Sequence, residues 1–89
     1  MQHKQTASPH PSAPGVVAVY DGTVMTLSIW AYAVESVGVN PKGPGIQIGM
    51  KSGAWFPADV SVGEFTTAQG AAMQSYIQQE RMLKSVKAA

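Results

Sequence analysis

The segment of residues 23–37 constrains the fold most, because it has the pattern of a single strand with apolar side chains on both faces. Side chains in a strand alternate between two faces. One face of this segment is an uninterrupted apolar row, and the other is half polar but carries two large aromatic rings. The first row contains Met25, Leu27, Ile29, Ala31 and Ala33, and the second contains Val24, Thr26, Ser28, Trp30, Tyr32 and Val34.

A chain of 89 residues is expected to form one small domain, and this chain has one convincing helix pattern. One helix covers one side of a sheet, so the other side of the predicted strand needs a second cover. We therefore expect a partner protein, a second copy of the chain or the chain's own N-terminal tail to provide it.

The composition also favours association. Hydrophobic residues make up 45% of the chain and charged residues only 12%, whereas soluble domains carry about 25% charged residues. A weakly charged surface promotes binding to copies or to partners. The formal net charge of +1 makes long nucleic acid an unfavourable partner, because binding to a polyanion requires a cluster of positive charge.

Several classes of site and location are disfavoured. The chain has no cysteine, so neither a disulfide nor a thiolate metal site is expected. The longest apolar run, residues 29–34, is too short to span a membrane. The polar N-terminus lacks the apolar region of a secretory signal, which favours the cytoplasm of the producing or host cell.

The chain divides into a tail and a domain. Residues 1–15 are rich in proline and small polar residues, and we expect a tail that is either flexible or pinned by a partner. Residues 16–89 are expected to form a single α+β domain. Its architecture is predicted to be a small antiparallel sheet of about four strands, with one C-terminal helix packed on one face.

The first hairpin of the predicted sheet follows from a turn signal. Asp21-Gly22 is a typical two-residue turn, and it would pair Tyr20 with Thr23. In that register Val16 and Ala18 share a face with Leu27 and Met25, and Val17 and Val19 share the other face with Thr26 and Val24.

The second hairpin is predicted around Ser52-Gly53, between strands at residues 46–51 and 54–62. Pro57 lacks a backbone N–H group and so makes the last strand an edge strand. In this register Trp55 belongs to the core face with Ile46, Ile48 and Met50, whereas Phe56 points the other way.

The last segment is predicted to be a helix that begins with a capping box, with Thr66 as N-cap and Gln69 reaching back to it. Its small residues are expected to lie on Ala31 and Ala33, since small side chains let a helix approach a sheet closely. The apolar stripe of this helix contains Ala68, Ala71, Ala72, Tyr76, Met82, Leu83 and Val86.

Catalysis is not predicted. Both histidines, His3 and His10, lie in the tail, the five acidic residues are scattered, and there is no cysteine nucleophile. Without a base near a nucleophile, an active site lacks its usual components. We therefore expect a protein that is not an enzyme and uses no cofactor.

One metal pattern is present. His3, third from a free amino terminus, can complete a square-planar nitrogen site for Cu(II) or Ni(II). Any chain that begins in this way shows the same chemistry, so an inert tail histidine is the simpler interpretation and no functional metal site is predicted.

The candidate partner-binding residues are Trp30, Tyr32, Val34 and Phe56, with Lys42 in the exposed loop before the second hairpin. Three interpretations of the aromatic residues stay open: the tail covers them, a protein partner binds them, or bases of a nucleotide stack on them. Met73 and Ile77 lie outside the helix stripe and form a second apolar patch, which is either the margin of the core or a dimer contact.

The leading functional hypothesis is a small protein-binding domain that acts by occupying a surface of another protein or of its own copy. Its size and architecture are typical of phage and mobile-element accessory proteins, which include inhibitors of host systems. One alternative is a nucleotide or nucleic-acid binder with an aromatic platform. The other is a homo-oligomeric structural subunit of a larger assembly.

Overall fold

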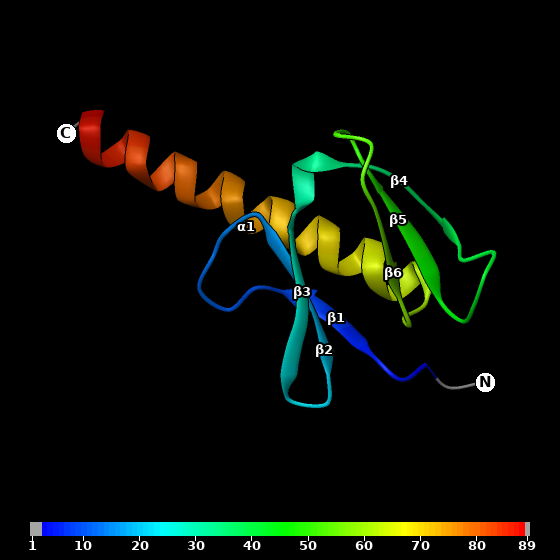
Figure 1. Ribbon diagram of the computed structural model, residues 1–89. Coiled ribbons are helices and arrows are strands. Elements are labelled where there is room, and N and C mark those ends of the chain that lie inside the picture. Colours follow the sequence, from blue (N-terminus) through cyan, green and yellow to red (C-terminus); the bar gives the residue numbers. More distant parts are fainter. Residues whose placement is uncertain (1–2, 89) are drawn as a thin grey trace.

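Residues 3–88 fold into two three-stranded antiparallel sheets and one long C-terminal helix (Figure 1). The computed structural model describes the backbone of residues 3–88 and the side chains of residues 3–85. The α+β class is as predicted, but six strands in two sheets replace the single sheet of about four strands.

Sheet A and sheet B follow one another along the chain. Sheet A contains β1 (Thr6–Pro9), β2 (Val16–Asp21) and β3 (Val24–Trp30), in that spatial order. Sheet B contains β4 (Val34–Val39), β5 (Ile46–Met50) and β6 (Trp55–Ala58), also in order. The short 3-10 helix η1 (Ala31–Ala33) joins the sheets, and helix α1 (Val62–Ala88) runs behind both of them in the view of Figure 1.

The apolar segment of residues 23–37 is not one strand, because η1 interrupts it after Trp30. Its first part pairs with β2 in sheet A, and its second part pairs with β5 in sheet B. The chain bends between the two parts, so that Ile29 and Ala31 enter a core shared by both sheets. The prediction of one continuous strand is therefore wrong, and the bend supplies within the chain part of the cover that a straight strand lacks.

The core lies between the two sheets and the first half of α1. It joins Val17, Val19, Ile29 and Ala31 from the sheet A side to Ile46, Ile48, Ala58 and Val60 from the sheet B side, and to Phe65, Ala68 and Ala72 from the helix. Phe65 is the largest of the fully buried side chains, and burying a phenyl ring contributes about 1.5 to 3 kcal/mol. The expected contact of small helix residues with Ala31 is present in this core, whereas Ala71 is exposed.

The register of the first hairpin differs from the prediction. Val17 lies opposite Ile29 and Val19 opposite Leu27, and the register shifts between Val19 and Tyr20. Thr26 is the extra residue of this bulge, and its hydroxyl donates a hydrogen bond to the Val19 carbonyl at 3.2 Å. One inserted residue moves every following side chain to the other face, which explains why Val17 and Val19 are buried.

Residues 6–9, which the sequence placed in the tail, form β1 and pair with β2. The Ala7 amide donates to the Glu64 carboxylate of α1 at 2.7 Å. Gln5 and Asp59 exchange two further hydrogen bonds, at 3.0 and 2.8 Å. The chain's own acidic residues therefore hold the segment that was expected to be flexible or held by a partner.

Helix α1 begins at Val62, earlier than predicted. The Ser61 hydroxyl accepts a hydrogen bond from the Glu64 amide at 3.0 Å, as an N-cap residue does. Thr66 is not the N-cap, because its hydroxyl donates to the carbonyls of Val62 and Gly63 inside the helix. The capping-box spacing occurs both at Ser61–Glu64 and at Thr66–Gln69. The acidic side chain of Glu64 favours Ser61 as the N-cap.

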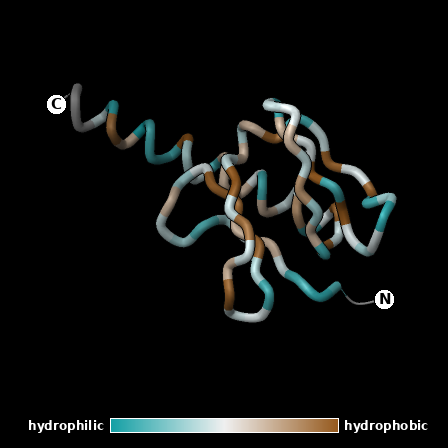
Figure 2. The backbone as a smooth tube through the Cα atoms, in the orientation of Figure 1, coloured by the Kyte–Doolittle hydropathy of each residue, from teal (hydrophilic) through white to brown (hydrophobic). Residues whose placement is uncertain are grey.

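The C-terminal half of α1 extends beyond the sheets (Figures 1 and 2). Residues 81–85 are all exposed, and Met82 and Leu83 retain 69% and 51% of their accessible surface. The predicted apolar stripe therefore packs against the core only in its first half, and the side chain of Val86 lies outside the described part. Within the described residues, no helix is long and apolar enough to cross a membrane.

We expect Ser61→Ala to lower the free energy of unfolding by about 1 kcal/mol, because it removes the N-cap of α1. Urea denaturation followed by far-UV circular dichroism measures the change. The matched control is Thr66→Ala, which removes a hydroxyl from the same helix but no cap, and it should stay within about 0.5 kcal/mol of the parent. A larger loss in Thr66→Ala than in Ser61→Ala would contradict the assigned helix start.

Candidate functional site

Three aromatic rings from three elements meet where α1 leaves the sheets. Trp30 ends β3, Tyr32 lies in η1, and Tyr76 lies on α1. The ring centroids of Trp30 and Tyr76 are 4.9 Å apart with an edge-to-face geometry, and Tyr32 lies 5.5 Å from Trp30 and 5.6 Å from Tyr76. Such pairs contribute about 0.5 to 1.5 kcal/mol beyond their buried area. We call these three residues the aromatic cluster.

Hydrogen bonds between η1 and α1 fix the cluster. The Tyr32 hydroxyl donates to the Met73 carbonyl at 3.3 Å, and the Gln69 side-chain amide donates to the Ala31 carbonyl at 3.1 Å. Both bonds join the bend in the chain to the helix. The rings are therefore held in place by regular elements of the fold.

Gly15 packs directly against the indole ring of Trp30. Its φ angle is +83°, and a Cβ atom placed on it would lie 2.3 Å from the indole ring. The Gly15 carbonyl also accepts a hydrogen bond of 2.7 Å from the Ala31 amide. The end of the proline-rich segment thus covers part of the indole, and Trp30 remains partly exposed.

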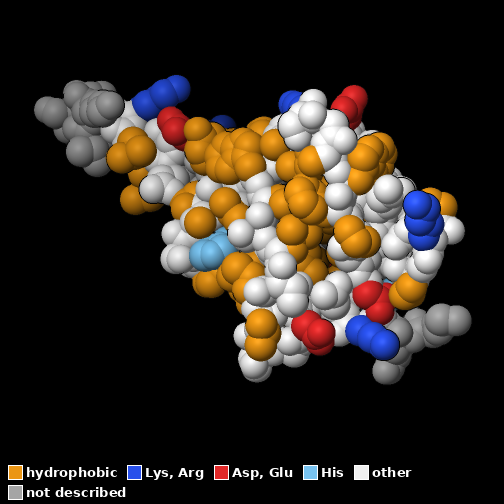
Figure 3. Space-filling view, in the orientation of Figure 1, with side chains coloured by type: hydrophobic (Ala, Val, Ile, Leu, Met, Phe, Trp, Pro, Cys, Tyr) orange, Lys and Arg blue, Asp and Glu red, His pale blue; other side chains and the backbone are white. Residues whose placement is uncertain are grey.

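The cluster is open to solvent in the described structure. Trp30 retains 39% of its accessible surface, and both tyrosines are half-buried. Figure 3 shows hydrophobic side chains gathered over the region where α1 leaves the sheets. The Glu80 carboxylate, one helical turn beyond Tyr76, raises the pKa of the Tyr76 phenol and gives the patch an acidic margin.

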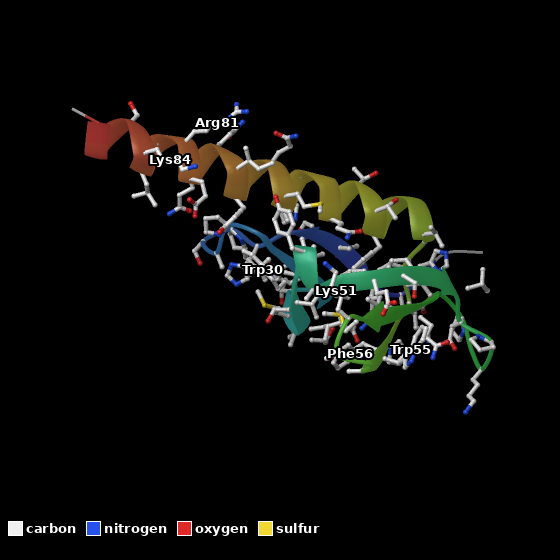
Figure 4. The ribbon with its side chains drawn as sticks, turned by 90° about the horizontal axis from the view of Figure 1, so that it is seen from above. Trp30, Lys51, Trp55, Phe56, Arg81 and Lys84 are labelled. Atoms are coloured by element: carbon white, nitrogen blue, oxygen red, sulfur yellow. The ribbon has the colours of Figure 1, made fainter. Side chains whose placement is uncertain are left out.

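The sequence predicted that Phe56 would join Trp30 and Tyr32. Phe56 is not part of the cluster, and the third ring is Tyr76. Phe56 lies opposite Ile48, on the core side of sheet B, whereas Trp55 lies across Gly49 on the outer side and is 56% exposed. In Figure 4 the labelled Trp55 and Phe56 lie well apart from Trp30. The predicted faces of Trp55 and Phe56 are therefore reversed.

The reversal comes from the turn between β5 and β6. Gly49 rather than Met50 pairs with Trp55, because the loop is one residue longer than a two-residue turn. Gly53 has a φ angle of +95°, and the Met50 amide donates to the Ala54 carbonyl at 2.9 Å. A register slip of one residue turns each side chain to the opposite face. The sequence would have predicted Tyr76 as a member of the cluster only if the apolar stripe of the helix had been assumed to pack against Trp30.

The other sequence-predicted residues do not belong to the aromatic cluster. Val34 is half-buried and packs against the core. Lys42 is exposed in the loop after β4, at the opposite end of that strand from η1. Met73 packs against the core and Ile77 is half-buried on α1, so the structure places Met73 at the core margin.

Both histidines make local contacts near the N-terminus. His3 Nδ1 lies 3.0 Å from a carboxylate oxygen of Asp59. His10 Nδ1 accepts hydrogen bonds from the amides of Ser12 and Ala13 and so shapes the loop that ends at Gly15. Among the described residues, no three His, Asp or Glu side chains are grouped as metal ligands. The candidate Cu(II) or Ni(II) site also requires residues 1 and 2, which lie outside the described residues.

A second surface feature is a hollow of about 420 Å³ between the N-terminal segment and the loop after β4. Most of its walls are apolar or glycine, and its polar side chains are His3 and Ser61. Ser61 already caps α1 and His3 already contacts Asp59. The hollow therefore offers few polar groups to orient a small ligand, and the aromatic cluster is the stronger candidate site.

Comparison of the chain with protein-family models, with curated proteins and with solved structures found no match.

We expect Gly15→Ala to destabilise the domain by more than about 1 kcal/mol, because alanine disfavours a positive φ and its methyl group would collide with the indole. Gly22→Ala is the matched control, since Gly22 also has a positive φ but its Cβ would meet open space. In a Trp55→Phe background, Trp30 fluorescence should shift to longer wavelength in Gly15→Ala only. Equal spectra in the two variants would contradict the close contact between Gly15 and the Trp30 indole.

The N-terminal contact should respond to acid. The hydrogen bond with His3 is the main cause that lowers the pKa of Asp59 below 3.8, and the Lys4 amide adds to it. A carboxyl group with a lowered folded-state pKa stabilises fully above its unfolded value and loses that effect as the pH falls through the lowered value. The Lys4 amide shift in NMR should therefore change as the pH falls below about 4, and Asp59→Asn should abolish this change at acid pH.

Proposed function

We propose that this chain is a small, non-enzymatic protein-binding domain that acts by occupying a surface of another protein. The observation that carries the proposal is the open side of Trp30, held at the meeting point of β3, η1 and α1. Tryptophan and tyrosine are enriched at the energetic centres of protein interfaces. The binding surface is the aromatic cluster, with the exposed start of the helix extension beside it.

The chemistry of the cluster favours a protein partner over a nucleotide. Its rings contact one another edge-to-face or at a tilt, and the nearest titratable neighbour of Tyr76 on the helix is the acid Glu80. Stacking of a nucleotide on an exposed ring is favoured by positive charge nearby. An apolar or aromatic side chain of a protein does not need that charge, and it can contact the exposed indole of Trp30 and the exposed Leu83 further along α1.

The absence of an assembled acid–base pair at the cluster supports a binding role rather than catalysis. His3 lies with Asp59, and His10 lies within the loop before β2. We extend the proposal to the role of an accessory protein, of the kind that phages and mobile elements use to inhibit host systems, acting in the cytoplasm of the producing or host cell. Small size and a rigid aromatic patch suit inhibition by surface occupation.

The proposal is tested by affinity capture from a lysate of the native host, with tagged parent and Trp30→Ser and Leu83→Ser variants compared. We expect a specific partner with the parent and a loss of capture by about 30-fold or more with Trp30→Ser, the range of an interface hot spot. Leu83→Ser should weaken capture without affecting stability, because Leu83 is exposed beyond the core.

Trp55→Ser is the matched control, since it removes an indole that is exposed elsewhere on the molecule. It should leave capture unchanged. If Trp30→Ser unfolds the isolated domain while Leu83→Ser binds normally, the cluster serves the core and the proposal is wrong. A change of Trp30 fluorescence with millimolar nucleotide would instead support the nucleotide alternative.

A further inference from the structure

The four outer edges of the two sheets are protected to different degrees. An unprotected edge presents free N–H and C=O groups that pair readily with another strand. The edge of β1 lies against α1, where the Ala7 amide bonds to Glu64. β6 has only four residues, includes Pro57, and is followed by Asp59, whose backbone bonds to Gln5. β4 carries the exposed charge of Glu35 and a bulge.

β3 lacks these protections over most of its length. It has seven residues with neither a charge nor a proline, and Val24, Met25 and Trp30 remain exposed along it. Its bulge lies at Thr26, so residues 27–30 form a regular edge. Natural edge strands of this length usually carry a charge, a proline or a cover that prevents pairing.

The direction of the free backbone groups follows from one hydrogen bond. The Ala31 amide donates to Gly15, on the side of β2. Backbone groups alternate along an extended chain, so Ile29 also points to β2 while Ser28 and Trp30 point outward. Within the described residues, the amides of Ser28 and Trp30 have no partner among the hydrogen bonds between segments.

We propose that β3 pairs antiparallel with β3 of a second copy of this chain, about a two-fold axis at Ile29. Ser28 of one copy then lies opposite Trp30 of the other, and the two residues exchange both backbone hydrogen bonds. The pairing joins two copies of sheet A into one six-stranded sheet. It satisfies the outward amides of residues 28 and 30 in both copies.

A second copy fits this edge for two reasons. No charged residue lies between Asp21 and Glu35, so an antiparallel self-pairing sets no like charges opposite each other. The exposed Ser28 is small and the exposed Trp30 is large, so the pairing sets a small side chain opposite a large one and avoids a clash between the two indoles. A two-fold interface of this type is self-complementary. The pairing goes beyond the proposed function, because it uses the strand edge and requires no foreign partner.

Sedimentation equilibrium from micromolar to millimolar concentration tests the pairing. The parent should shift with concentration from its monomer mass of 9.4 kDa to twice that mass. Ser28→Lys should weaken dimerisation at least 10-fold, because it places a charge beside the indole and brings two lysines together across the axis. Thr67→Lys, which adds the same charge at an exposed position on α1, should leave the dimer unchanged.

Amide hydrogen exchange on the unmodified chain provides a measurement that does not depend on how a variant folds. The amides of Ser28 and Trp30 should exchange at least 10-fold more slowly in a concentrated than in a dilute sample, while exposed amides of β4 keep their rates. A monomer at every concentration, or a dimer equally tight in folded Ser28→Lys, would overturn the proposal. So would a monomer that takes up a foreign extended peptide at β3, and this result would leave the proposed function standing.

Discussion

The bend at η1 is the constraint on which the rest of the structure depends. A single strand over residues 23–37 would present apolar side chains on two faces, and one helix cannot cover both. The bend turns the second part of the segment into another sheet, so the two sheets share one core. Ala31 is fully buried at this point and bonds to both Gly15 and Gln69. The bend is thus held from the N-terminal side and from the helix at once.

The start of α1 connects the N-terminal segment to this core. Ser61 caps the helix, and Glu64 in its first turn accepts the Ala7 amide of β1. A carboxylate in the first turn of a helix also interacts favourably with the helix dipole. One acid therefore stabilises the helix start and anchors β1, the strand that pairs with β2 at the edge of sheet A. Asp59 holds the residues before β1 in a similar way.

The two proposed binding surfaces lie where this packing stops. The helix has 27 residues, and its packed face ends near the aromatic cluster. Beyond Tyr76 the helix continues into solvent, and within residues 3–88 no further strand pairs with β3 in sheet A. Trp30 belongs to both surfaces, because it is the last residue of β3 and also contacts Tyr76 of α1. A partner that binds the cluster and a copy that pairs with β3 would therefore meet at the same residue.

The sequence by itself determined the α+β class, the C-terminal helix, the strand character of the hydrophobic runs and the prominence of Trp30 and Tyr32. These features depend on local periodicity and turn propensity, which the residues carry with them. Only the tertiary structure decided the bend at η1, the strand made by residues 6–9, the faces of Trp55 and Phe56, and the membership of Tyr76 in the cluster. Each of these depends on a bulge or turn of one extra residue, or on a contact between segments distant in sequence. A difference of one residue reverses a strand's faces at little local cost, so the packing of the whole core selects the register.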